Sequence, residues 1–221
     1  MIELYDGIMT TRAIRRFTDE PLARDEIVAC LRAAQQAPSG GNSQPWQYLV
    51  VTDRDAKAAI GVEYLIAYQR WEAAQLSALP SDWPELERSR YMRGVELSRG
   101  LAEHLSEAAA LVLFLMPRVS ITPVDDEGPV EIGPLYASVY PAVQNFMLAA
   151  RSQGIGTVLT TVWWSRQAEL RALLDIPDRF EIVAMVPMGR PSGRFGVAPR
   201  KPIEPLTHWD RYGNRPLTDA S

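Results

Sequence analysis

The amino-acid sequence predicts an α+β fold in which about four strands form a sheet that is sandwiched by helices. Continuous apolar runs at residues 110–116 and 180–188 are typical of central strands buried on both faces. Elsewhere, apolar residues recur every three or four positions, which is the pattern of amphipathic helices. The chain contains no internal repeat and no clear linker, so we expect residues 1–221 to form a single domain.

Length and composition are those of an ordinary globular protein, with 221 residues, 47% hydrophobic and 23% charged. No apolar run approaches the length of a membrane span, and the N-terminus lacks the basic and apolar regions of a signal peptide. A single cysteine, Cys30, excludes an internal disulfide framework. We therefore expect a cytoplasmic protein without a membrane partner.

Charge and ligand spacing argue against two further classes of protein. The net charge of -4 argues against nucleic acid as the main partner. The two histidines, His104 and His208, lie far apart in the chain, with no carboxylate or cysteine at ligand spacing. We therefore expect no bound metal ion.

The first elements read as a short helix over residues 2–10, a helix over residues 22–37 and a strand over residues 47–52. The second helix is supported by apolar residues at positions i, i+3, i+4 and i+7, namely Ile27, Cys30, Leu31 and Ala34. Because Cys30 lies on this apolar face, we interpret it as a small core residue rather than a nucleophile.

Residues 62–105 are helical in pattern and rich in charge, with a break at residues 80–84. The second half carries an apolar stripe that we expect to face the core, formed by Leu97, Leu101, Leu105 and Ala108. The first half and the break carry the aromatic residues Tyr64, Tyr68, Trp71 and Trp83. These rings either pack on the body of the domain or form a lid over a flat apolar substrate, and their spacing does not distinguish the two.

The C-terminal half contains an apolar helix over residues 135–152, a short strand over residues 157–161 and a helix over residues 166–174. The strand over residues 180–188 follows. The tail from Ser192 onward is rich in Pro, Gly and Arg and shows no periodicity. Such a segment rarely folds on its own, and a second copy of the chain is the partner that we expect it to wrap.

A loop over residues 38–46 joins the second helix to the first strand. Two glycines follow a proline and a serine, and small hydroxyl and amide side chains come next, before a second proline. This composition brings bare backbone close to a ligand and offers neutral hydrogen-bonding groups that would orient a heterocycle. Taken alone, the loop is better explained as an ordinary turn between a helix and a strand, because such punctuation is common.

Arginines gather near the N-terminus at positions 12, 15 and 16. In a helix all of them would share a face, whereas in an extended segment Arg15 would point away from Arg12 and Arg16. The cluster is either a solvated surface or a phosphate clamp, because arginine side chains bind phosphate oxygens bidentately. The sequence leaves both interpretations open.

Several motifs together resemble the FMN-dependent nitroreductase family. Residues Arg12–Phe17 resemble the N-terminal Arg-Ser-x-Arg-x-Phe signature of the family, and Pro38–Trp46 resembles its Pro-Ser-(small)-x-Asn-Ser-Gln-Pro-Trp loop. Further similarities occur at Ala150–Gly156, Pro187–Pro191 and Arg200–Pro202. The similarity covers almost the whole chain except about residues 62–101 and is specific because the motifs occur together and in order.

The resemblance implies a three-layer α+β sandwich. A central, mostly antiparallel sheet would be flanked by helices, with residues 62–105 as a helical lid or insertion. It also implies a homodimer with FMN at the interface and a C-terminal tail that wraps the partner protomer. The reductant would be NADH or NADPH.

The resemblance also implies roles for individual residues. The FMN phosphate would be held by Arg12 and Arg15 together with Arg200, and Lys201 would add charge. The flavin would be lined from the second subunit by Pro38, Ser39 and Gly40, with Asn42 positioning that loop. The edge of the isoalloxazine ring would be followed by Leu159, Thr160 and Thr161, with a backbone N–H near Thr161 facing flavin N5. Substrate contacts would come from Gly41, Tyr68 and Trp71.

One departure from the family pattern is Ala13, which stands where the family usually has a serine and would lie at the phosphate. The missing hydroxyl should weaken FMN binding by about 1 kcal/mol at most, the size of an ordinary hydrogen bond. Flavin-destroying relatives carry an aspartate at this position, so that chemistry is not expected. Deiodinase relatives use a Glu, Tyr and Lys in the lid, and lysine is absent from residues 62–105. A halotyrosine substrate is therefore not expected either.

The resemblance implies an oxidoreductase that works by alternating half-reactions. NAD(P)H would reduce FMN at N5, and a flat electron-poor acceptor such as a nitroaromatic or a quinone would then take its place. No side chain stands out as a general acid, so we predict no catalytic residue. The alternative is a protein of the same fold that binds and sequesters flavin without turnover.

Overall fold

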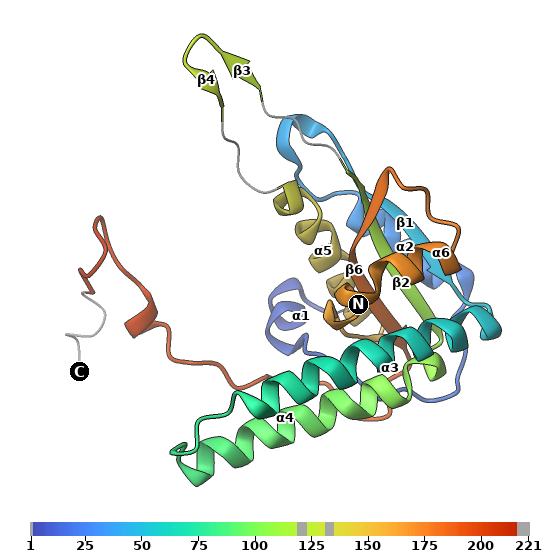
Figure 1. The fold of residues 1–221 in the computed structure, drawn as a ribbon, viewed down its shortest axis with the longest axis horizontal. Helices are drawn as coiled ribbons and strands as arrows, with labels where there is room; N and C mark the ends of the chain where they lie inside the picture. Colours follow the sequence, from blue (N-terminus) through green and yellow to red (C-terminus); the bar gives the residue numbers. More distant parts are fainter. Residues whose placement is uncertain (1, 119–122, 131–134, 216–221) are drawn as a thin grey trace.

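The computed structural model describes residues 2–118, 123–130 and 135–215. Its main sheet is four-stranded and antiparallel, in the order β1-β2-β6-β5. The strands are β1 (Gln47–Val51), β2 (Ala110–Pro117), β5 (Gly156–Thr157) and β6 (Phe180–Gly189). Figure 1 shows this sheet between layers of helices, so the predicted α+β sandwich with an antiparallel sheet is confirmed.

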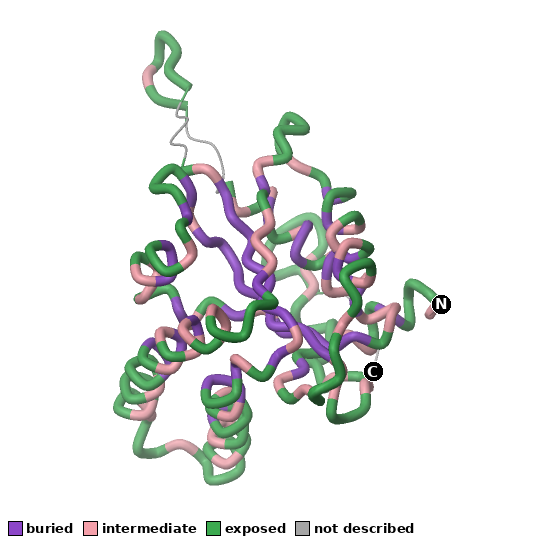
Figure 2. Tube along the Cα trace, turned by 90° about the vertical axis from the view of Figure 1, so that its right-hand side faces the viewer, coloured by how far each residue is buried: buried purple, intermediate pink, exposed green. Residues whose placement is uncertain are grey.

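The central strands β2 and β6 are buried over nearly their whole length, which explains why their sequences are continuously apolar. Along β2, Val112 and Phe114 face one core while Leu111 and Leu113 face the other. In β6 the alternation of side chains between the two cores is interrupted between Ile182 and Ala184. These two residues pair with Leu115 and Phe114, and the register shifts between them. Figure 2 shows the buried strands running through the centre of the molecule.

Helices cover both faces of the sheet. On one face lie α2 (Arg24–Ala34) and α5 (Tyr140–Ser152). On the other lie α3 (Arg54–Ser77), α4 (Glu85–Glu103) and α6 (Gln167–Leu173). Each face of the sheet therefore has its own apolar core, and β2 and β6 supply side chains to both.

The predicted helix over residues 135–152 is in fact divided. A 3₁₀ turn (Leu135–Ser138) precedes α5, whose first turn contains Pro141. Because proline lacks an N–H and suits only the first turn of a helix, it marks the start of α5. The predicted strand over residues 157–161 is likewise shortened to β5 and an isolated bridge at Thr160. Opposite this interruption β6 carries Pro187, which accepts from Val158 N–H at 3.3 Å but has no N–H to donate.

The long helices α3 and α4 form an antiparallel pair that extends beyond the sheet (Figure 1). The predicted break between them is confirmed, because α3 ends at Ser77 and α4 begins at Glu85. The expectation that Leu97 faces the core is wrong, since it is 45% exposed, while Val95 is 3% exposed. With about 100° of rotation per residue, Leu97 lies roughly 200° around the helix from Val95.

The remaining elements lie around this sandwich. They are α1 (Leu4–Thr10), the hairpin β3 (Val124–Asp125) and β4 (Gly128–Pro129), and short 3₁₀ turns at Gly40–Asn42, Leu105–Glu107, Val162–Arg166 and Glu204–Leu206. None of the described helices is long and apolar enough to cross a membrane.

The C-terminal tail leaves the body of the protein (Figure 1). Phe195 still contacts the body, with the Arg151 guanidinium 4.0 Å from the centre of its ring. Within the described chain, the hydrogen bonds of residues 196–214 are internal to that segment. Several large apolar side chains of the tail are exposed: Val197, Ile203, Leu206, Trp209 and Tyr212. The predicted wrapping of a partner protomer by this tail stays a prediction.

Candidate functional site

Residues 12–17, which we name the arginine segment, lie extended beside the edge of the sheet. The Ile14 N–H donates to the Thr157 carbonyl at 2.9 Å, in a parallel bridge between Ala13 and Thr157. At its other end the segment continues as an antiparallel bridge between Phe17 and Pro191. The segment is therefore extended rather than helical, with Ile14 buried, Arg15 half-buried and both Arg12 and Arg16 exposed.

Two glycines allow the arginine segment to approach the sheet so closely. A Cβ atom at Gly156 would lie 2.7 Å from Cγ2 of Ile14 and 3.0 Å from its Cβ. A Cβ atom at Gly189 would lie 3.0 Å from Cδ1 of Phe17. Because β5 and the end of β6 lie directly beneath the segment, side chains at these positions would displace it.

Arg15 and Arg16 line a cavity of about 570 Å³ between the arginine segment and α4. The other residues that line it are Phe17, Glu96, Arg99, Gly100, Glu103, His104, Glu107 and Ser192. Among the described residues, neither Arg15 nor Arg16 forms an ion pair, whereas Arg99 is bound to Glu72 at 2.9 Å. The lining therefore combines these two unpaired guanidinium groups with the carboxylates of Glu96, Glu103 and Glu107, and Arg15 and Arg16 are the groups in it that an anion would bind.

Behind the arginine segment, the hydroxyls of Tyr64 in α3 and Thr160 lie 2.7 Å apart in a buried hydrogen bond. Burial raises the pKa of Tyr64, while the bond to Thr160 and the charge of Arg15 oppose this rise. Thr160 is also fixed through its backbone, since its N–H donates to Met185 at 3.0 Å and its carbonyl accepts from Trp163 Nε1 at 2.9 Å. Thr160 is thus held from several sides.

The residues beside Thr160 differ in what they offer to a ligand. Leu159 is half-buried and packs against the core that α2 and α5 cover. Thr161 is exposed, and its backbone N–H donates to no group in the part of the chain that the structure describes. An exposed, unpaired N–H is what the predicted contact at Thr161 requires.

Residues 38–46, which we name the proline–serine loop, have an unusual backbone. Gly41, Asn42 and Gln44 have φ values of 57°, 53° and 45°, in the left-handed region that non-glycine residues rarely adopt. Ser39 Oγ accepts from the Gln44 N–H at 3.0 Å, and the Gly40 N–H donates to Ser138 Oγ at 3.2 Å. The conformation is fixed by these bonds although residues 40–44 are exposed to solvent.

Within one chain, the proline–serine loop and the arginine segment lie at opposite corners of the sheet. The loop enters β1 at Gln47, which pairs with Leu115. The arginine segment pairs with Thr157, whose partner Met188 pairs in turn with Ala110. Along β2, Leu115 and Ala110 are roughly 17 Å apart at about 3.3 Å per residue. In addition, β1 and β5 are the opposite edges of the sheet.

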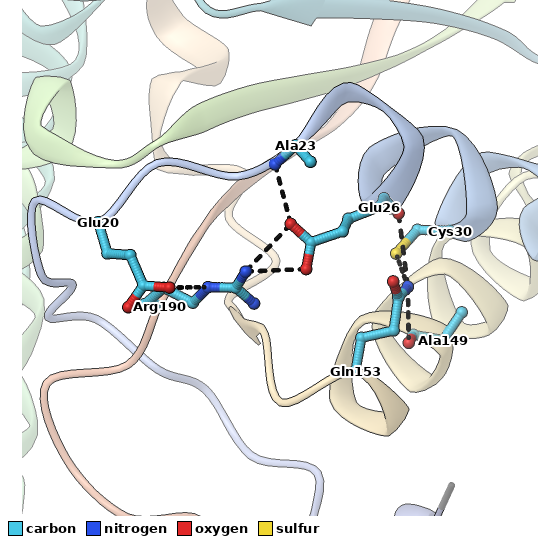
Figure 3. Close-up of polar contacts among 7 residues, drawn as sticks. All are labelled: Glu20, Ala23, Glu26, Cys30, Ala149, Gln153 and Arg190. Carbon is cyan, nitrogen blue, oxygen red and sulfur yellow. Dashed lines mark hydrogen bonds and ion pairs between the residues drawn. The ribbon is translucent and has the colours of Figure 1, made fainter.

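A network of charged groups ties the chain that follows the arginine segment to Arg190 beyond β6 (Figure 3). Arg190 contacts both carboxylate oxygens of Glu26 at 2.8 and 3.0 Å and Glu20 at 3.0 Å. The Glu26 carboxylate also accepts from the Ala23 N–H at 2.8 Å, at the start of α2. The Ala23 N–H foremost, and the Arg190 guanidinium in addition, lower the pKa of Glu26. Backbone bonds from Thr18 N–H to Arg190 O and from Ser192 N–H to Arg16 O, at 2.9 and 3.1 Å, complete the attachment.

Comparison with known proteins identifies the family. Residues 8–190 match the model of the nitroreductase family, which is well over half of the chain. The chain belongs to the nitroreductase family. The match includes the arginine segment, the proline–serine loop and β6 with Arg190 at its end.

Individual relatives within and around this family carry several different names. The chain is 28% identical to a protein of Archaeoglobus fulgidus described as an NADH dehydrogenase/NAD(P)H nitroreductase, over 86% of this chain and 87% of that protein. It is 25% identical to 4-nitrobenzoate reductase of Pseudomonas putida, over 93% of this chain and 95% of that protein. A solved structure of iodotyrosine deiodinase bound to FMN and 3-iodo-L-tyrosine has a TM-score of 0.72 at 22% identity, covering 95% of this chain and all of that one.

The nitroreductase-like residues that we predicted from sequence are brought together only in part. Arg15, Thr160 and Thr161 gather around one edge of the sheet, and Arg12 and Ala13 lie exposed on the same segment. Pro38, Ser39, Gly40, Gly41 and Asn42 lie at the far corner. Arg200 and Lys201 are exposed on the tail, where Arg200 bonds only to the neighbouring Pro199 carbonyl at 3.2 Å among the described residues. The cofactor roles of all these residues stay predictions.

Tyr68 and Trp71, the predicted substrate contacts of α3, have different surroundings. Tyr68 is 1% exposed, and its hydroxyl lies 2.9 Å from the Val95 carbonyl and 3.0 Å from Glu72 Oε1. Its ring therefore packs between α3 and α4 and offers no surface to a substrate in this conformation. Trp71 is 36% exposed and borders a cavity that it shares with Thr161. Of the two, Trp71 alone is placed to contact a ligand beside Thr161.

Tyr64 is the residue that sequence reasoning did not assign to the site. The sequence shows it as one of several aromatic residues at helical spacing, with nothing to indicate a polar partner. That partner, Thr160, lies 96 residues further along the chain.

Proposed function

We propose that this protein is an FMN-dependent oxidoreductase that oxidises NAD(P)H and reduces a flat electron-poor acceptor such as a nitroaromatic or a quinone. The observation that carries the proposal is the position of Arg15 and Arg16. They line a cavity against α4 and form no ion pair with any described carboxylate. Arg15 also lies close enough to Tyr64, the hydrogen-bond partner of Thr160, for its charge to act on the Tyr64 hydroxyl. Membership of the nitroreductase family supports the same conclusion.

The residues present fit the phosphate end of FMN. A phosphate monoester carries a charge of about -1.5 to -2 at neutral pH and offers several acceptor oxygens. In a protein that is acidic overall, unpaired arginines close together on one segment form a local positive charge suited to an anion. The backbone bonds of the arginine segment and the ion pairs of Arg190 hold these cations in place before binding, which lowers the entropic cost of gripping the phosphate.

The neutral groups fit the flavin ring. The unpaired N–H of Thr161 would donate to a ring nitrogen, and the buried bond between Tyr64 and Thr160 would keep that N–H in position. Because the proline–serine loop of the same chain lies at the opposite corner of the sheet, we propose that a second copy supplies it. The site would then be completed at a dimer interface.

When bound, FMN would supply the hydride chemistry, accepting reducing equivalents from NAD(P)H and passing them to the acceptor. The chain itself would bind the phosphate through Arg12 and Arg15, orient the ring through Thr161, and limit access of water through α3 and α4. The described residues of the cavity beside Thr161 include no Asp, Glu or His that would act as a proton donor there.

Absorption spectroscopy tests this proposal directly. Purified protein reconstituted with FMN should show the visible flavin bands, lose them on anaerobic addition of NADH or NADPH, and regain them when a nitroaromatic or quinone is added. Failure to bind FMN would overturn the proposal. Flavin that binds but is never reduced would overturn turnover and support sequestration instead.

A further inference from the structure

We infer that the cavity between α3 and residues 161–165 binds acceptors that carry a carboxylate on a flat aromatic ring, and that Arg70 is the residue that recognises the carboxylate. This inference rests on the proposed function, because it names the class of acceptor that the same site takes. It assigns a specificity-determining role to Arg70, a residue of α3 that neither the sequence motifs nor the proposed cofactor contacts include.

The cavity has a volume of about 420 Å³ and opens beside Thr161, where the proposed flavin edge lies. From α3 it is lined by residues at positions i, i+3, i+4 and i+7, namely Ala67, Arg70, Trp71 and Ala74. The opposite side is formed by Thr161, Val162, Trp164 and Ser165. One face of α3 is thus turned toward the residues that precede α6.

The shape and chemistry of these walls suit a flat aromatic ring. Trp71 of α3 and Trp164 of the 3₁₀ turn both line the cavity and keep 36% and 44% of their surface exposed. Indole rings bury a large area against planar ligands and prefer stacked or edge-on contacts. Ala67 and Ala74 take up little space, so a ring bound in the cavity would lie against the indoles rather than against long side chains.

Arg70, which is exposed to solvent, gives the cavity a positive charge that no carboxylate in the described part of the chain pairs with. The cavity is lined by no Asp or Glu, and Arg70 forms no ion pair or hydrogen bond with any described residue. Other arginines nearby are paired: Arg166 contacts Glu63 at 2.7 Å and Glu169 at 2.8 Å. A planar guanidinium next to apolar walls binds a carboxylate through parallel N–H···O bonds.

The cavity therefore combines a cation with apolar walls. Arg70 would hold the carboxylate, and the acceptor would meet the proposed flavin edge beside Thr161. An acceptor held this way would present the ring position away from its carboxylate to the reducing centre. The cavity thereby favours anionic nitroaromatics over neutral ones of the same shape.

Kinetics with a matched pair of substrates test the inference. We expect the FMN-loaded enzyme to reduce 4-nitrobenzoate with a higher kcat/KM than 4-nitrobenzamide, its neutral analogue of similar shape. Arg70→Gln should lower kcat/KM for 4-nitrobenzoate by about tenfold to a hundredfold, the range for a hydrogen bond to a charged group. The same variant should leave 4-nitrobenzamide nearly unchanged, and Arg70→Lys should restore part of the preference.

Arg88→Gln is the matched control, because Arg88 is an exposed arginine of α4 without an ion pair in the described chain. It removes the same charge and should leave the preference intact. Equal losses in the two variants would overturn a specific role for Arg70. Arg70→Gln could instead slow reduction of the flavin by NADPH, but not by NADH, and leave kcat/KM for 4-nitrobenzoate unchanged. That result would assign Arg70 to binding of the reductant and would overturn the inference as well.

Binding without turnover separates this inference from the proposed function. Quenching of Trp71 and Trp164 fluorescence by 4-nitrobenzoate reports occupation of the cavity whether or not flavin is reduced. We expect Arg70→Gln to weaken this binding by a factor similar to its effect on kcat/KM. Unaltered binding would overturn the inference even if the enzyme is an active nitroreductase, and weakened binding would support it even if turnover fails.

Discussion

The hydroxyl of Tyr64 lies 2.7 Å from Oγ1 of Thr160, although the two residues belong to a helix and to the edge of the sheet. The bond is buried, with Tyr64 2% and Thr160 7% exposed. It connects α3 to the residues that follow β5, the strand beside which the arginine segment lies. We therefore regard it as the connection that sets α3 relative to the proposed flavin site.

Replacing Tyr64 tests this connection. Tyr64→Phe leaves the Thr160 hydroxyl buried without its partner, so we expect a loss of about 1–3 kcal/mol in the free energy of unfolding. For a chain of this size, each kcal/mol lowers Tm by about 2–4 °C, which circular dichroism measures readily. The double variant Tyr64→Phe/Thr160→Val should cost less than the sum of the single variants, because both hydroxyls are then absent. Strictly additive losses would show that the two hydroxyls do not interact.

Gly156→Ala should displace the arginine segment, because its Cβ would lie 2.7 Å from the buried side chain of Ile14. We expect both lower stability and weaker FMN binding, since Arg12 and Arg15 flank Ile14. Titration of the apo-protein with FMN measures the second effect. Gly94→Ala in α4 is the control: a Cβ there meets nothing within 4 Å, and alanine should stabilise the helix by up to about 1 kcal/mol. Normal FMN affinity in Gly156→Ala would contradict the proposed role of the segment.

The contacts of Glu26 predict how stability depends on pH. Its folded-state pKa is lowered, so its contribution is complete above the unfolded-state value near 4.5 and is lost as pH falls through the lower folded-state pKa. Glu26→Gln should therefore unfold at lower urea concentration than the wild type at pH 7, and this difference should shrink below pH 4.5. Glu127→Gln, at an exposed hairpin position, serves as the control and should show no such difference. A gap between wild type and Glu26→Gln that stays constant from pH 7 to pH 3.5 would contradict the interpretation.

Removal of residues 196–221 tests the proposed role of the tail. Because hydrogen bonds of residues 196–214 are internal to the segment, the truncated body should keep its far-UV circular dichroism spectrum. The exposed apolar residues of the tail, among them Trp209 and Tyr212, should instead stabilise a dimer. We expect light scattering to give a dimer for the full chain and a smaller mass for the truncated one. Val124→Ser, which removes an equally exposed apolar residue elsewhere, should leave the mass unchanged. An unchanged dimer after truncation would exclude the tail from the interface.

Sequence patterns predicted the central strands well because a strand that is buried on both faces has a continuous run of apolar residues. The strands expected at residues 110–116 and 180–188 end within one residue of β2 and β6. The shorter strand after Gly156 was predicted too long, because its partner Pro187 breaks the pairing from the other side of the ladder. The residue pattern of one strand does not show whether its partner strand has the backbone N–H groups needed to continue the pairing.

The helix pair and the site show the same limit more clearly. Apolar spacing placed Leu97 on the core face of α4, whereas the face is set by packing against α3, where Val95 lies. The arginine segment and the proline–serine loop were recognised as motifs, but only the register of the sheet places them at opposite corners. Tyr64, Thr160 and Arg70 acquire their roles from contacts between distant segments, which local periodicity does not encode.

The central claim is that the arginine segment binds the phosphate of FMN, and comparison of FMN with riboflavin tests it most directly. Riboflavin carries the same ring without the phosphate, so the ratio of the two Kd values isolates the contribution of the arginines. We predict that the apo-protein binds FMN at least about a hundredfold more tightly than riboflavin, and that Arg15→Gln reduces this ratio about tenfold or more while Arg88→Gln does not. Equal affinities for FMN and riboflavin, or a ratio that Arg15→Gln leaves unchanged, would contradict the claim.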